Sequence, residues 1–413
     1  LDALIFTDTT CDHVSFLLTL GRVAPIQAAF LGTPITSGDP AIDYFMSADV
    51  LESPDRTIMM SEDDSYTEQQ VVLLGGQGVW YPAPALPLEL APPPPSLSPH
   101  LLETATFGEH RHSNAAAAAQ DLSAHAHNDT AEEVERTLPG ITSSAHRNAA
   151  PESEDTIGDM RSDQQSLATA EECDAGRAPR EQRRNVLRAE LKDRIGVDKG
   201  SVVYMCAQSI FKLHPRFDTA AKGVLEASIS NHIVFTEGRK PKWTATFRER
   251  LRSTVGNEMM TRVIFVPRTT EYFSLLASAE VALHPFPFGG SKTSADALAL
   301  GVPTVAMAGK FAFGRMAQSF YKTMGLEKTC CIASDVARQA NSAIVHVAIV
   351  YVSLAARLGR DVEFRNRIVD LIDQRQWALW ERRDEARMTL KSFFARFGGL
   401  SPPTPEEVSK SSA

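Results

Sequence analysis

The chain has 413 residues, 43% of them hydrophobic, and a formal net charge of −9, so it is long enough for two domains with separate cores. The negative charge argues against a general nucleic-acid partner. The sequence contains no run of eighteen apolar residues, so no membrane span and no membrane partner are predicted. Its five cysteines are scattered without a C-x-x-C pair, which indicates reduced thiols in the cytoplasm or nucleus rather than disulfides or a zinc site.

The first block, residues 1–83, has the pattern of an α/β half-domain. Apolar strands are predicted at 3–6, 26–31, 42–46 and 71–74, with a short helix at 16–20. The sequence opens on Leu1-Asp2-Ala3-Leu4-Ile5-Phe6, which resembles a core strand and not a signal peptide. This first domain is therefore expected to be incomplete.

Residues 84–182 have a different composition. They contain four consecutive prolines from Pro92, an alanine run at 115–119 and many serine, acidic and histidine residues, without apolar periodicity. A disordered insertion is predicted. Its histidines at 110, 112, 125 and 127 could suggest a metal site, but their low-complexity surroundings favour a solvated loop, and no metal is predicted.

Regular alternation of helices and strands returns from 183 to 395. Strands are predicted at 202–206, 233–235, 263–266, 281–284, 302–306 and 330–332, with helices between them, long helices at the end and a disordered tail at 396–413. The alternation predicts a doubly wound parallel sheet, in which ligands bind beyond the carboxyl ends of the strands.

A glycine turn between the strand at 281–284 and the next helix is the most informative motif. It reads Phe286-Pro287-Phe288-Gly289-Gly290-Ser291-Lys292-Thr293-Ser294-Ala295-Asp296. Two glycines allow close backbone approach, and the free N–H groups and dipole of a helix start favour an anion. Lys292 adds a charge, Thr293 a hydroxyl, and Asp296 a carboxylate that could reach sugar hydroxyls. These features are typical of a nucleotide diphosphate site.

A plain turn explains the same residues equally well when they are taken alone. Ser291 or Thr293 could cap the helix, and Gly289-Gly290 could serve only the turn. The spacing is neither that of a Walker A loop nor that of the dinucleotide motif G-x-G-x-x-G.

Two other predicted strand ends carry polar residues. Gln208 and Lys212 follow the strand at 202–206: an amide could read a base or sugar, and an ammonium could neutralise the phosphates of a departing nucleotide. Pro267 and Arg268 follow the strand at 263–266, where backbone groups could read a nucleobase and Arg268 could meet a phosphate. A capping or solvated role explains each residue taken singly. Their shared position at strand ends favours one site.

Several motifs together resemble the O-linked N-acetylglucosamine transferase family, which includes plant-type protein O-fucosyltransferases. The resemblance covers about 1–83 and 198–395. It rests on the segments Gly21–Gln27, Gly32–Gly38, Ile42–Phe45, Val79–Tyr81, Gln208–Lys212, Gly289–Leu298, Gly301–Val305 and Gly314–Met316.

This resemblance implies an α/β glycosyltransferase B fold, with two Rossmann-like domains and a C-terminal helical segment. It implies inverting, metal-independent transfer of N-acetylglucosamine from UDP-GlcNAc to Ser or Thr of intracellular proteins, without a further cofactor. The implied catalytic residue is Lys212, at the diphosphate. The implied donor-binding residues are Gln208, Pro267 and Arg268 at the nucleotide, Gly289, Gly290, Ser291, Lys292 and Thr293 at the phosphates, and Asp296 at the ribose.

The sequence also departs from its relatives. Many of them have His where this chain has Ser291 and Thr where it has Lys292, and the family's N-terminal segment and tetratricopeptide repeats are not found. A GDP-fucose donor or an N-linked glucose transfer therefore remains an alternative. A catalytically degenerate nucleotide-binding module is the alternative from another class.

Overall fold

The computed structural model describes residues 2–7, 13–30, 36–52, 68–73, 81–87, 90–91, 170–309, 312–329, 331–333, 343–380, 387 and 391. Contacts divide the chain into one unit of residues 1–95 with 176–413 and a second unit of residues 96–175. Of the second unit only residues 170–175, the start of a helix, are described. The four histidines considered for a metal site and the tail at 396–413 lie outside the described residues.

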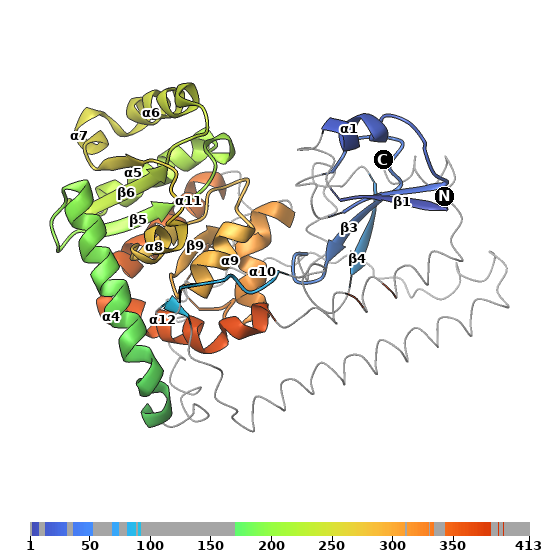
Figure 1. Cartoon of the computed structure of the whole chain (residues 1–413). Helices are drawn as coiled ribbons and strands as arrows, with labels where there is room; N and C mark the ends of the chain where they lie inside the picture. The colour runs from blue at the N-terminus through green and yellow to red at the C-terminus, as the bar shows by residue number, and fades with distance from the viewer. Residues whose placement is uncertain are drawn as a thin grey trace, which may run out of the picture. The chain divides into compact units, whose positions relative to one another are not determined.

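The N-terminal block forms a four-stranded parallel sheet with the order β1-β2-β3-β4 (Figure 1). Its strands are β1 (Ala3–Phe6), β2 (Ile26–Ala29), β3 (Tyr44–Ala48) and β4 (Gln69–Leu73), and helix α1 (His13–Thr19) follows β1. All four predicted strands are present, with ends that differ by no more than two residues. The central strands β2 and β3 are buried along their whole length, as expected for the inner strands of a parallel sheet.

The second sheet has six parallel strands in the order β10-β9-β8-β5-β6-β7. They are β5 (Val202–Cys206), β6 (Asn231–Thr236), β7 (Val263–Val266), β8 (Val281–Leu283), β9 (Thr304–Met307) and β10 (Ile332–Ala333). This is the doubly wound order 3-2-1-4-5-6. After β5 the chain adds β6 and β7 on one side of that strand, and it then adds β8, β9 and β10 on the other side. The topological switch point, where such sheets bind ligands, therefore lies between the carboxyl ends of β5 and β8.

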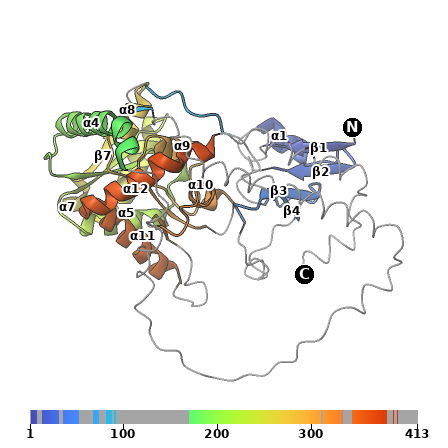
Figure 2. The same ribbon diagram turned by 90° about the horizontal axis from the view of Figure 1, so that it is seen from below.

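Helices cover both faces of this second sheet (Figure 2). They are α4 (Ala170–Ile195), α5 (Pro215–Glu226), α6 (Pro241–Val255), α7 (Asn257–Met260), α8 (Tyr272–Ala277), α9 (Lys292–Ala299), α10 (Met316–Thr323), α11 (Ala343–Arg360) and α12 (Val362–Arg375), with short 3-10 helices η4 (Ile210–Lys212), η5 (Ala312–Arg315) and η6 (Gln376–Leu379). Among the helices that the structure describes, none is both long and apolar enough to cross a membrane.

Strand residues alternate between two cores on the two faces. Tyr204 and Cys206 of β5 belong to the core that includes apolar residues of α5, α6 and α11, whereas Val203 and Met205 face the core that includes α4 and α8. This two-residue period follows from the pleat of a strand. Burial on both faces explains why the strand sequences read as continuous apolar runs.

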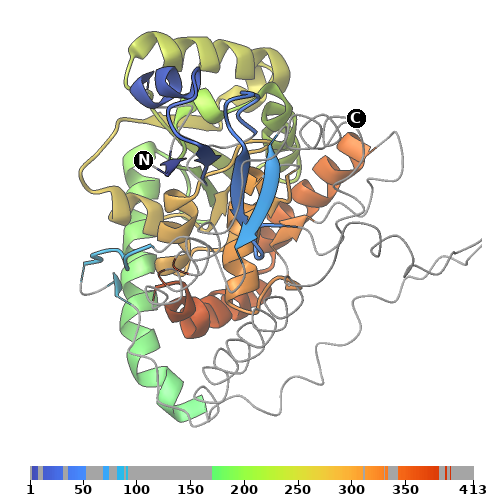
Figure 3. The same ribbon diagram turned by 90° about the vertical axis from the view of Figure 1, so that its right-hand side faces the viewer.

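Both edges of the range predicted as a disordered insertion carry defined contacts. Helix α4, the long green helix of Figures 1 and 3, begins at Ala170, and Leu90 is buried in the α4 core. Arg180 Nε donates a hydrogen bond to the Leu90 carbonyl oxygen at 3.0 Å. The composition of the whole range concealed these short apolar and charged anchors at its ends.

Candidate functional site

The glycine turn lies at the carboxyl end of β8, beside the switch point. Strand β8 ends at Leu283 and α9 begins at Lys292. Gly301, with φ of +68°, follows the end of α9, in the left-handed conformation that glycine adopts without a steric penalty. The predicted strand, turn and helix are thus all present, and the first turn of α9 faces the crevice side of the sheet.

Gly289 and Gly290 leave space that neighbouring side chains occupy. An added Cβ would lie 1.7 Å from His284 Cε1 at Gly289, and 1.9 Å from Gln208 Nε2 at Gly290. Neither glycine has a positive φ. The glycines therefore let the side chains of His284 and Gln208 pack directly against the turn backbone. This role differs from the two predicted from the sequence, close approach to a ligand and a plain turn.

Gln208 and Thr293 meet across the switch point. Gln208 follows β5, and its Nε2 donates a hydrogen bond to Thr293 Oγ1 in the first turn of α9. Gln208 is buried. Because β5 and β8 are adjacent strands, residues 85 positions apart in the sequence come together.

Lys212 also lies at the turn. It closes the 3-10 helix η4 after β5, and its ammonium lies 5.0 Å from the ring centroid of Phe288, directly before Gly289. The side chain is half-buried. Lys212 thus lies beside the residue that directly precedes the two glycines of the turn.

Asp296 is engaged by other residues of the site. The Lys292 ammonium forms a salt bridge with Asp296 Oδ1 one turn along α9. Burial raises the pKa of the Asp296 carboxyl, and the contact with Lys292 opposes that shift. Burial and the nearby Asp296 charge raise the pKa of Tyr272. The Asp296 carboxylate is therefore paired with Lys292, and a sugar hydroxyl would have to share or replace that salt bridge.

Ser291 is bonded to a residue of the N-terminal block. Its hydroxyl shares a hydrogen bond with the Tyr81 hydroxyl, and the Tyr81 ring packs edge-on against Phe320 with centroids 5.7 Å apart. Ser291 does not cap α9 with its side chain. Tyr81 thus contacts the turn, although it was not among the predicted site residues.

Pro267 and Arg268 do not join this cluster. Both are exposed and follow β7, the edge strand that β6 separates from β5, about 10 Å from β5 at normal strand spacing. Thr269 Oγ1 accepts a hydrogen bond from Glu271 N at 3.0 Å, in keeping with a local turn. Position within the sheet order, which the sequence does not reveal, separates this strand end from the other two.

His284 lies at the turn, although it was not among the predicted site residues. It is 1% exposed, and Gly290 N donates a hydrogen bond to its Nε2 at 3.1 Å. Its Nδ1 makes no hydrogen bond within the described part of the chain. The pKa of His284 is lowered to about 4, mainly by burial and also by the Lys212 charge, while the Gly290 carbonyl oxygen, 3.1 Å from Nε2, opposes the shift. Its position in the sequence, directly after β8 and shortly before Gly289 and Gly290, was the one local feature that could have marked His284 as a site residue.

The lowered pKa predicts an acid-sensitive step in stability. Unfolded His284 takes up a proton near its ordinary pKa of 6.5, whereas folded His284 does so only near 4. The stability that neutral His284 contributes is therefore complete above pH 6.5 and is lost as the pH falls to 4, by up to about 3 kcal/mol. Free energies of unfolding measured from pH 4 to 7 should show this loss in the wild type and not in His284→Gln. Parallel curves for the two proteins would contradict the prediction.

Metal ligands do not gather around the turn. Among the residues that the structure describes, no group of three or more His, Cys, Asp or Glu side chains is placed to hold a metal ion.

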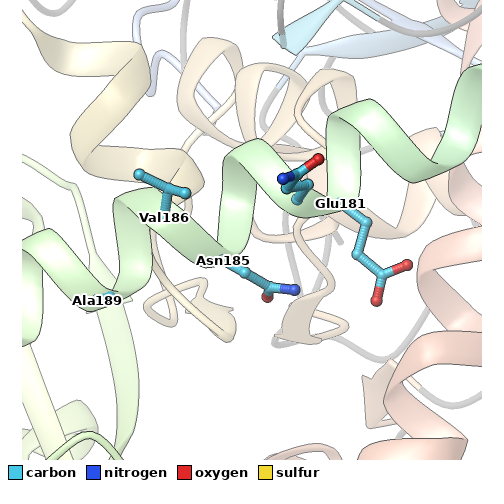
Figure 4. Close-up of a pocket in the computed structure, with 5 residues that line it drawn as sticks. Glu181, Asn185, Val186 and Ala189 are labelled. Carbon is cyan, nitrogen blue, oxygen red and sulfur yellow. The ribbon is translucent and has the colours of Figure 1, made fainter.

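A surface hollow elsewhere in the second sheet's domain is not a candidate site. It is lined by five residues of α4, namely Glu181, Gln182, Asn185, Val186 and Ala189 (Figure 4). All five come from one helix, and none of the predicted site residues lines the hollow.

Comparison with known proteins supports the fold. No protein-family model and no curated protein matches the chain. A solved mutant O-GlcNAc transferase from Thermobaculum terrenum is similar with a TM-score of 0.53 and 16% identity, over 96% of this chain and 53% of that chain. The present chain thus spans about half of that structure's length.

Two other solved structures are less similar. WaaG, which takes part in lipopolysaccharide biosynthesis, has a TM-score of 0.35 and 16% identity over 52% of this chain and 51% of its own. HepE of Anabaena, solved with UDP and glucose, has a TM-score of 0.32 and 14% identity over 52% and 53%. With the strand order described above, the similarity to the first structure shows that this chain has a mixed α/β fold of the glycosyltransferase B type, built on parallel Rossmann-like sheets.

Proposed function

We propose that this chain is the catalytic region of a glycosyltransferase that uses a nucleotide-sugar donor. The observation that supports it is the meeting of Gln208, Lys212 and Thr293 at the Gly289–Gly290 turn, at the switch point of the sheet. An amide, an ammonium, a hydroxyl and the N-terminus of α9 together suit a nucleoside diphosphate.

The same residues suit the chemistry of inverting transfer. The acceptor oxygen attacks the anomeric carbon and gives up its proton to water or to the departing diphosphate. The bond between that carbon and the diphosphate breaks, so negative charge grows on the diphosphate. Lys212 and the first N–H groups of α9 would stabilise that charge in the transition state. This mechanism requires no metal, because the positive charge is supplied by the protein.

The finer proposal is transfer of N-acetylglucosamine from UDP-GlcNAc to Ser or Thr of intracellular proteins. It is supported by the ordered motifs at Gln208–Lys212 and Gly289–Leu298 and by similarity to a solved O-GlcNAc transferase. A fucosyl or N-linked glucosyl donor reaction would use the same diphosphate contacts.

A second candidate is a nucleotide-binding module without catalytic activity. Two observations favour it: Asp296 is paired with Lys292, and Ser291 is bonded to Tyr81. Both side chains would otherwise be available to a donor.

Melting temperatures measured with UDP, GDP, UDP-GlcNAc and GDP-fucose would separate these candidates. A rise with UDP and UDP-GlcNAc alone supports a UDP-sugar donor, and radiolabel transfer to Ser/Thr-containing peptides then establishes the enzyme. A rise without transfer favours the binding module. No rise with any of the four nucleotides would contradict both.

Lys212→Ala is expected to weaken UDP binding about tenfold or more, since a hydrogen bond to a charged group contributes about 1.5–3 kcal/mol. Isothermal titration calorimetry measures the effect. The matched control is Lys222→Ala, because Lys222 lies on α5 in an exposed pair with Glu226 at 3.7 Å. Equal affinity of Lys212→Ala and wild type would remove Lys212 from the site.

A further inference from the structure

Three side chains form a row beside the glycine turn. The Lys212 ammonium lies 5.0 Å from the Phe288 ring centroid. The Phe288 ring in turn stacks on the Phe313 ring, with centroids 5.0 Å apart and an angle of 30° between the ring planes. Phe288 and Phe313 are both half-buried. A lysine ammonium within about 6 Å of an aromatic face is attracted by the ring quadrupole.

The row joins the lysine to the turn. Phe288 directly precedes Gly289, so its ring moves with the turn backbone. Lys212 belongs to η4, which follows β5, the strand next to β8. A free lysine side chain samples many rotamers, and holding it in one costs conformational entropy. A ring that attracts the ammonium before the donor arrives reduces that cost at the moment of binding.

The third member keeps the ring in place. Phe313 belongs to η5, and the next residue is Gly314. A Cβ atom at Gly314 would lie 2.8 Å from the Pro287 carbonyl oxygen and from Gly309 Cα. The close approach that glycine allows at this position therefore brings η5 against the turn, with Phe313 stacked on Phe288.

We propose that Phe288 is a positioning residue, which holds the Lys212 ammonium at the Gly289–Gly290 turn for the diphosphate of the donor. This inference rests on the proposed function, because it assigns to Phe288 the placement of that function's principal charge. Phe288 acts through Lys212 and need not contact the donor.

A double-mutant cycle tests this dependence. Phe288→Leu removes the ring and keeps an apolar side chain, and it is expected to weaken UDP binding about two- to fivefold, the range of a partly exposed cation–π contact. In the Lys212→Ala background the same change should have no further effect. Phe288→Tyr, which keeps the ring, should restore wild-type affinity. A full Phe288→Leu loss in the Lys212→Ala background would overturn the proposal, since the ring would then act by itself.

A second measurement needs no nucleotide. After reductive ¹³C-methylation of the lysines, the Lys212 methyl resonance, assigned by its disappearance in Lys212→Ala, should be shifted upfield by the Phe288 ring current. The shift should vanish in Phe288→Leu and persist in Phe288→Tyr. An unshifted Lys212 resonance in the wild type would overturn the positioning role alone. Failure of the wild type to bind any nucleotide, with the shift present, would instead overturn the proposed function and with it the use of the row for a donor.

Discussion

Alanine at position 290 is expected to abolish measurable UDP binding while the second sheet remains folded. The new Cβ would lie 1.9 Å from Gln208 Nε2 and 2.3 Å from Thr293 Oγ1, far inside van der Waals contact. Gln208 is buried and bonded to Thr293, so the methyl group must separate the two side chains that join β5 to α9. The turn would then lose the arrangement proposed to receive the diphosphate.

Calorimetric titration with UDP, beside circular dichroism of both proteins, checks this result. Gly200→Ala is the matched control, because Gly200 has no atom within 4 Å of an added Cβ and no positive φ. It should bind UDP as the wild type does. Wild-type affinity in Gly290→Ala would show that the meeting of Gln208 and Thr293 is not needed for the nucleotide.

The second large effect is expected on stability, from Asp373→Ala. Asp373 of α12 forms salt bridges with Arg180 and Arg184 of α4, the second at 3.2 Å. The two arginine side chains are only 2% and 3% exposed, and burial lowers the pKa of Arg180 to about 10. Removing the carboxylate leaves two buried guanidinium groups without their counter-charge, which typically costs about 3–5 kcal/mol.

Urea denaturation measures this loss as a change in the free energy of unfolding. The control is Glu226→Ala, which removes an exposed helical pair with Lys222 at 3.7 Å and should cost less than about 0.5 kcal/mol. A cost for Asp373→Ala as small as the control's would mean that water or other groups compensate the two arginines.

The same two arginines also contact the end of α9. They donate hydrogen bonds to the carbonyl oxygens of Ala299 and Leu300, so this cluster supports the helix that carries the proposed site.

Most elements of the second sheet could be predicted because their residues carry local signals. The strands at 202–206 and 263–266 were predicted with the observed bounds, since each is a short run of apolar, mostly β-branched or aromatic residues. His214 caps α5 by accepting a hydrogen bond from Arg216 N at 3.2 Å, the structural role that a residue before Pro215 suggests. Such features depend on neighbours within a few positions.

The site was predicted only in part, because it depends on the order of the strands. Gln208 and the glycine turn meet because β5 and β8 are neighbours, whereas Arg268 stands apart because β7 is an edge strand. All three loops follow strands in the sequence, and nothing local distinguishes them. Tyr81 and His284 were missed for a related reason: each becomes a site residue through tertiary contacts with the turn.

The alternation of strands and helices, and the glycine turn with its charged residues, could be predicted from local sequence, because they depend on the periodicity and backbone freedom of adjacent residues. Three contacts could be known only from the folded chain: Gly289 and Gly290 make room for His284 and Gln208, Lys292 pairs with Asp296, and Lys212 lies over Phe288. Steric fit and charge pairing depend on side-chain positions in space. The close packing of residues that are distant in sequence therefore determines them.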